Sequence, residues 1–163
     1  MILKPYTTLL KQDWNKFVAE SKNATFLFNR DFMDYHSDRF EDCSLIFEDK
    51  GRILACLPAN VDRERRQIVS HGGLTYGGVL MSEKITMVQV LEIFRLSADY
   101  FKKEYGAERW LYKPIPYIYS SYPAQEDLYA LFRMGAVLES RAVSSAIQLQ
   151  GRLQMSTGRL QCV

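Results

Sequence analysis

Histidine and cysteine are scarce in this chain, which limits the chemistry that it can carry. Its 163 residues include two histidines and three cysteines. Cys43, Cys56 and Cys162 are odd in number and share no metal-ligand spacing, so the sequence predicts no metal site. Reduced thiols in a cytoplasm are the simplest interpretation of these cysteines.

Long apolar runs and a strong charge of one sign are also missing. No run approaches the roughly 18 residues that a membrane span requires, and the first five residues lack a signal-peptide pattern. The net charge of +2 gives no electrostatic footprint for nucleic acid. The sequence therefore predicts a cytoplasmic protein that neither spans a membrane nor binds nucleic acid through a basic surface.

The familiar catalytic and nucleotide-binding motifs are absent as well. The chain contains neither Gly-x-Gly-x-x-Gly nor Gly-Lys-Ser/Thr, which excludes the dinucleotide and P-loop patterns. Spacing shows no Ser–His–Asp or Cys–His arrangement and no carboxylate pair. What remains is a composition typical of one soluble domain, with 47% apolar, 25% charged and an unusually high 13% aromatic residues.

The most informative stretch is the glycine-rich run 70–80, which holds four of the nine glycines. It lies between an apolar run ending near Val69 and a long helical pattern. Glycine allows close approach of a ligand to the backbone, so this loop is a candidate site for a small polar group bound by N–H donors. A tight connection whose polar side chains bond neighbouring backbone is the alternative. The candidate ligand contacts are His71, Gly73, Thr75, Tyr76, Gly77 and Gly78.

Periodicity predicts the remaining elements. Asp13 is a candidate cap for a first helix and Asn29 for a second one. A hairpin is expected over residues 43–61, with its turn at residues 49–51 and a second strand that is interrupted, bulged or at a sheet edge at Pro58. A helix is expected over residues 83–105, with a buried stripe beginning at Val88 and a stop at Gly106. Further predictions are strands over 67–70, 109–113 and 137–149, and a helix over 124–133.

The strand–helix–strand run 67–113 favours a parallel strand pair with a right-handed crossover. The carboxyl ends of both strands then lie at one sheet edge, where ligands tend to bind in open α/β sheets. Residues 114–123 would meet the glycine loop there as a second wall. Lys113, directly before these residues, belongs to the same wall and either pairs with an anion or is solvated. The wall tyrosines Tyr117, Tyr119 and Tyr122 either bind a sugar or peptide face or pack in the core, and we expect at least one to be buried.

Several runs resemble a known family. Residues 25–36, 70–78, 113–119 and 126–133 look like FemAB-like proteins of the GNAT acyltransferase superfamily, in particular members from Bacteroidetes. The resemblance covers the chain to about Leu149. It implies an α/β (α+β) fold of GNAT type, with a mixed, partly splayed sheet flanked by helices. It also implies that residues 1–149 are the amino-terminal, acceptor-binding domain of an N-acyltransferase that uses acyl-CoA or aminoacyl-tRNA.

The same resemblance suggests where the acceptor binds. The loop matching residues 71–78 would form its cleft, and His36 stands where relatives carry a basic contact residue. His71 and Tyr76 are the catalytic candidates, although the loop departs from the Gln/Arg-x-x-Gly-x-Gly/Ala pattern that binds the acyl-CoA pyrophosphate in GNAT enzymes. The polar tail 150–163 looks like the start of a linker to a second GNAT domain, to which the acyl-donor site chiefly belongs.

Two other interpretations remain open. The chain is alternatively a non-catalytic, degenerate GNAT module that binds a glycan, peptide or protein partner through its tyrosines. In the last interpretation, the chain is a half-domain that must form a homodimer, and an exposed apolar face would be the structural sign of this.

Overall fold

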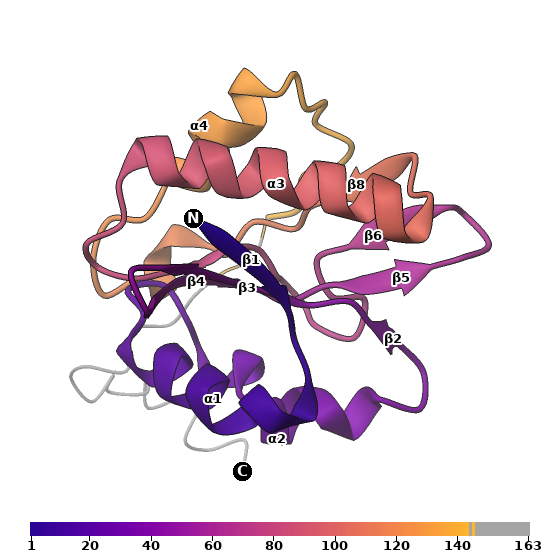
Figure 1. Ribbon diagram of the computed structural model, residues 1–163. Helices are drawn as coiled ribbons and strands as arrows, with labels where there is room; N and C mark the ends of the chain where they lie inside the picture. The colour runs from indigo at the N-terminus through magenta and orange to yellow at the C-terminus, as the bar shows by residue number, and fades with distance from the viewer. Residues whose placement is uncertain (144, 146–163) are drawn as a thin grey trace, which may run out of the picture.

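The computed structural model describes residues 1–143 and 145, whose strands form two four-stranded sheets between layers of helices (Figure 1). The first sheet has the order β1-β3-β4-β7 and the second β2-β5-β6-β8. All neighbouring strands are antiparallel except the parallel pair β6 and β8. The strands are β1 (Ile2–Pro5), β2 (Glu41–Asp42), β3 (Leu45–Asp49), β4 (Arg52–Leu57), β5 (Asn60–Asp62), β6 (Gln67–Val69), β7 (Leu80–Met81) and β8 (Arg109–Leu111).

Helices cover both faces of the first sheet (Figure 1). The α-helices are α1 (Lys11–Glu20), α2 (Arg30–Met33), α3 (Met87–Tyr105) and α4 (Glu126–Arg133). Short 3-10 turns occupy η1 (Thr8–Leu10), η2 (Phe26–Phe28), η3 (Asp34–His36) and η4 (Tyr117–Tyr119). Successive residues of a strand point to opposite faces, and β3 shows it: Leu45 and Phe47 pack toward α3, whereas Ile46 packs with Trp14 of α1. The sheet therefore separates two apolar cores.

The predicted hairpin is present, and Pro58 marks the division between the sheets. Lys50 and Gly51 both have positive φ, of 50° and 75°, as a two-residue hairpin turn of type I′ requires. β4 ends at Leu57, and after the proline the chain enters β5 in the second sheet. The predicted interruption at Pro58 is confirmed, because proline donates no ladder hydrogen bond.

Helix ends follow local capping chemistry. Asn29 caps α2 as predicted, since its side chain accepts a hydrogen bond from the Asp31 N–H. Gly106 ends α3 in the left-handed conformation, also as predicted. The cap at Asp13 is wrong, because α1 begins two residues earlier and Asp13 lies in its first turn. The start of α3 near residue 83 is wrong too: Thr86 and Gln89 form a capping box, so the helix begins at Met87.

Two further expectations need correction. The buried stripe of α3 includes Val90, Ile93 and Phe101, whereas Val88 is 75% exposed. The strand expected over 137–149 is absent from residues 137–143 and 145, and its other residues lie outside the described ones. The tail 150–163 lies outside them as well, so its assignment as a linker stays a prediction.

Candidate functional site

The parallel strands β6 and β8 bring the two predicted loops together. Their register pairs Val69 with Leu111, and the pairing continues one residue further through a 2.9 Å hydrogen bond from Ser70 N to Leu111 O. Beyond it the Lys113 N–H donates to Ser70 Oγ at 2.7 Å, and the Gly77 N–H donates to Lys113 O at 2.9 Å. The glycine loop and the second wall therefore meet at the carboxyl edge of the parallel pair, as the crossover argument predicts.

Gly77 and Gly78 are required by close packing in this loop. A Cβ on Gly77 would lie 1.7 Å from the carbonyl oxygen of Ser70. Gly78 has a φ of +123°, and a Cβ there would lie 2.7 Å from the Tyr112 hydroxyl oxygen. Both glycines thus serve the fold, and the Gly77 N–H is already bonded to Lys113. Among the described residues no acceptor takes the Gly78 N–H.

The polar members of the loop differ in exposure. His71 is buried, adopts a positive φ of 62° and lies beside the Phe40 ring at a centroid distance of 5.7 Å. A turn closed by the Leu74 N–H on His71 O follows, and it leaves Gly73 half-buried and Thr75 exposed. His71 therefore faces the interior of the loop, whereas Thr75 faces solvent. His36 is the last residue of η3, which belongs to a different segment of the sequence from this loop.

Within the described part of the chain, Lys113 has no anionic partner and is not simply solvated. Its ammonium donates to the carbonyl oxygen of Leu74, on the opposite loop. Partial burial lowers the pKa of Lys113, because the charged form is costly to desolvate. The lysine thereby joins the two walls of the site.

The tyrosines form an aromatic surface rather than part of the core. Tyr119 stacks on Tyr76 with ring centroids 5.2 Å apart and an interplanar angle of 24°. Tyr117 and Tyr122 are exposed, and with residues 120–125 they line a hollow of about 280 Å³. The expectation that at least one of the three wall tyrosines is buried is wrong. The sequence pattern did not predict that the ring of Tyr119 stacks on the ring of Tyr76.

Tyr76 also connects the glycine loop to the amino-terminal helices. Its hydroxyl donates to Thr25 Oγ1 at 3.2 Å, and its ring contacts Phe28 edge-on. Partial burial raises the pKa of Tyr76, so the hydroxyl keeps its proton at neutral pH. The resemblance places acceptor contacts in the loop and at His36, and the contacts of Tyr76 join the loop to the run 25–36 at Thr25 and Phe28.

A buried pair that sequence reasoning missed supports the site from behind. The Tyr112 hydroxyl accepts from the Val79 N–H at 2.9 Å and donates to Asp127 Oδ2 at 2.7 Å. Burial raises the pKa of both groups. Nearby, the buried ammonium of Lys22 pairs with Glu126 at 2.5 Å. Both contacts hold α4 against the loops, and no local pattern in the sequence signals a pairing across such separations.

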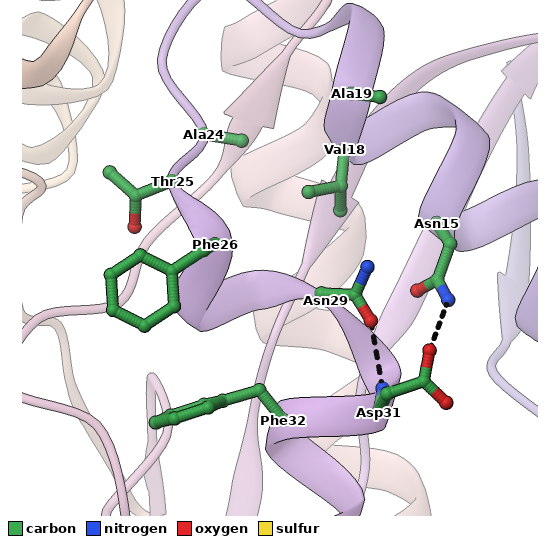
Figure 2. Close-up of a pocket in the computed structure, with 9 residues that line it drawn as sticks. All are labelled: Asn15, Val18, Ala19, Ala24, Thr25, Phe26, Asn29, Asp31 and Phe32. Carbon is green, nitrogen blue, oxygen red and sulfur yellow. Dashed lines mark hydrogen bonds between the residues drawn. The ribbon is translucent and has the colours of Figure 1, made fainter.

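A second and larger hollow has Thr25 among its lining residues. It has a volume of about 540 Å³ and lies between α1 and the segment from Ala24 to Phe32 (Figure 2). Figure 2 shows the rings of Phe26 and Phe32 projecting to the same side of it. In the sequence, this region is marked by the run 25–36, which is part of the family resemblance, and not by any prediction of a hollow.

Two classes of site find no counterpart in the residues that the structure describes. Across 1–143 and 145, no group of three or more His, Cys, Asp or Glu side chains is arranged to hold a metal ion. Within the same residues, no helix has the length and apolar character needed to cross a membrane.

The fold is that of GNAT-type acyltransferases. An aminoglycoside antibiotic 6'-N-acetyltransferase from Acinetobacter haemolyticus, solved in its apo form, matches with a TM-score of 0.53 at 12% identity, over 92% of this chain and 100% of that one. The protein TTHA1254 from Thermus thermophilus matches with a TM-score of 0.54 at 14% identity, over 91% and 98% of the two chains. No protein-family model and no curated protein matches the sequence. The similarity at these identities establishes the fold.

Proposed function

We propose that this chain is an N-acyltransferase domain of GNAT type that binds the amine acceptor, and that it belongs to the FemAB-like group. The observation that carries the proposal is the match of nearly the whole chain to the fold of an N-acetyltransferase. In this chemistry an amine attacks an activated acyl carbon, and the protein positions the reactants and stabilises the developing oxyanion.

The acceptor cleft in this proposal lies where the glycine loop meets the tyrosine wall. Tyr76 and Tyr119 present stacked rings there, and Tyr117 and Tyr122 border the adjoining hollow. The N–H groups of Gly73, Thr75, Tyr76 and the buried Gly78 are the backbone donors of this loop that have no acceptor among the described residues. Together these groups would bind a small-molecule, glycan or peptide acceptor and orient its amine.

Among the residues that the structure describes, groups at the glycine loop and at the start of α3 are engaged within the fold, which does not favour an acyl-CoA pyrophosphate there. The ammonium of Lys113 is bonded to Leu74 O, and the Gly77 N–H is bonded to Lys113 O. At the start of α3, the Thr86 side chain already accepts from the Gln89 N–H. We therefore assign no acyl-donor step to this domain. An acyl-CoA or an aminoacyl-tRNA would be bound chiefly by a second domain.

Isothermal titration of the chain with amine acceptors and with acetyl-CoA tests this proposal. Amino sugars and peptides with free amines are suitable acceptors, and their N-acetylated forms are the matched controls. We expect binding that needs the free amine and weakens in Tyr119→Ala, whereas Tyr129→Phe on α4 should bind as the wild type does. If no free amine is preferred over its acetylated form, the chain is not an acceptor domain.

A binding module without catalysis is the second candidate. The observation in its favour is that the polar groups of the loop are largely bonded within the fold, while the tyrosines stay exposed. Under this alternative, acetylated and free ligands would bind equally well. The homodimer also stays a prediction; large exposed apolar side chains at Phe132, Val137 and Val143 are consistent with it, and sedimentation equilibrium would measure it.

A further inference from the structure

The hollow of about 540 Å³ beside α1 has the size of a small-molecule site, for which about 300–1,000 Å³ is usual. It lies outside the glycine loop and is not used by the proposed acyl transfer. Its lining comes from α1, from η2 and from α2, which converge around it (Figure 2). The lining residues are Asn15, Val18, Ala19, Ala24, Thr25, Phe26, Asn29, Asp31 and Phe32.

One side of this hollow is apolar. Val18, Ala19 and Ala24 contribute small aliphatic groups. Phe26, which is 72% exposed, meets Phe32 edge-to-face with ring centroids 5.4 Å apart. The two rings hold each other in place and leave aromatic surface open to solvent. Such a wall favours a ligand with a flat face of C–H groups.

The opposite rim is polar and held in position by the backbone. The Asn15 amide oxygen accepts from the Arg30 N–H at 2.8 Å, and the Asn29 amide oxygen accepts from the Asp31 N–H at 2.9 Å. With its oxygen engaged, Asn29 can offer only its amide NH₂, which has no hydrogen-bond partner among the residues described. Asp31 adds a carboxylate whose Oδ2 accepts from the Asn15 amide at 3.3 Å and which keeps further lone pairs for a ligand hydroxyl. Fixed donors and acceptors therefore stand next to the aromatic wall (Figure 2).

The charge of the rim is balanced. Among the described residues that line the hollow, Asp31 is the one that carries a charge, and the Lys11 ammonium lies 2.7 Å from its Oδ1. A cationic ligand would have to compete with Lys11, and an anionic ligand would meet the Asp31 carboxylate. The hollow accordingly suits an uncharged ligand.

We propose that this hollow binds the ring of an uncharged saccharide. The C–H face of the sugar packs on the exposed ring of Phe26, beside Phe32, while its hydroxyls accept from the Asn29 amide and donate to the Asp31 carboxylate. A sugar ring is the ligand class that combines an apolar face with hydroxyls that both donate and accept. This proposal does not require acyl transfer and holds whether or not the chain is an enzyme, although Thr25 both lines the hollow and contacts Tyr76 of the proposed acceptor cleft.

Backbone amide NMR shifts during titration of the full chain with methyl β-glucoside and N-acetylglucosamine test the proposal. Glucosamine and glucose 6-phosphate serve as the cationic and anionic counterparts. We expect saturable shifts at the amides of residues 15–32 with the uncharged sugars and weaker binding of both charged ones. Phe26→Ala should weaken binding about tenfold, from the loss of stacking and contact area. Val88→Ala removes an equally exposed apolar side chain on α3 and should bind as the wild type does.

A second variant separates ligand contact from folding. Asn29→Ser keeps a side-chain oxygen to cap α2 but removes the amide donor, so it should fold normally and bind the sugars more weakly. Unchanged affinity in Phe26→Ala or Asn29→Ser overturns the proposal. So do an absence of shifts with either uncharged sugar, shifts confined to residues 117–125, and tighter binding of a charged sugar.

Discussion

Substitution of Gly77 by alanine should destabilise the protein strongly, although its backbone is not in the left-handed region. The added Cβ would lie 1.7 Å from Ser70 O, whereas ordinary contacts begin at 3.4 Å. Ser70 has little freedom to move away, because its N–H is bonded to Leu111 O and its hydroxyl accepts from the Lys113 N–H. Relief of the clash therefore requires the glycine loop to separate from the chain that follows β8.

The structure sets the size of the effect. Overpacking typically costs about 1–3 kcal/mol, and each buried hydrogen bond lost adds about 1 kcal/mol, so we expect a loss of about 3–5 kcal/mol in the free energy of unfolding. For a chain of this length that lowers the Tm by about 10 °C or more. Gly106→Ala is the matched control, because Gly106 has a φ of +61° but no atom within 4 Å of its Cβ. It should cost about 1–2 kcal/mol, from backbone strain alone.

Urea unfolding followed by circular dichroism measures both variants against the wild type. The expected order is wild type, then Gly106→Ala, then Gly77→Ala, with similar m-values for all that fold. A Gly77→Ala protein that does not fold, beside a folded Gly106→Ala protein, agrees with the geometry. A Gly77→Ala protein within about 1 kcal/mol of the wild type would refute the close approach to Ser70.

Three further predictions follow from single side chains. Burial raises the pKa of Asp127 in the folded protein. Its contribution to the free energy of unfolding is therefore full below the unfolded pKa of 3.8 and is lost as the pH rises through the raised pKa. Asp127→Asn should remove this pH dependence, which urea unfolding at a series of acidic pH values measures. Thr86→Ala should cost about 1 kcal/mol in urea unfolding, because the capping box of α3 is lost. Burial raises the pKa of the Cys43 and Cys56 thiols, so both should react with a disulfide reagent only after denaturant is added, and rapid native labelling at either position would contradict this.

Elements defined by local chemistry were predictable from the sequence. The turn at Lys50 and Gly51, the cap at Asn29 and the helix stop at Gly106 each depend on backbone conformations that particular residues favour. The parallel pairing of β6 and β8 could be predicted from the chain connectivity, because a long crossover helix joins the two strands. The same prediction placed the two loops of the candidate site together.

Features that depend on tertiary packing were not predictable. Apolar residues on α3 fit two overlapping stripes, and packing selects the one with Val90 and Ile93 while Val88 stays exposed. The contact of Tyr112 with Asp127 joins residues 15 positions apart through a buried hydroxyl that has no sequence signature. The short strands β2 and β7 contain two residues each, which is too few for an alternating pattern.

The internal hydrogen bonds of the loop narrow the choice of catalytic groups. An oxyanion donor needs an N–H that is not already bonded and that is fixed toward the reacting carbonyl, whereas the Gly77 and Val79 N–H groups already donate to Lys113 O and the Tyr112 hydroxyl. The Tyr76 hydroxyl donates to Thr25 and would have to leave it to serve a substrate. The N–H groups of Gly73, Thr75, Tyr76 and Gly78 have no acceptor among the described residues and need no such rearrangement. In the proposed acyl transfer, the loop would therefore draw a backbone donor from these amides, while the exposed tyrosines bind the acceptor.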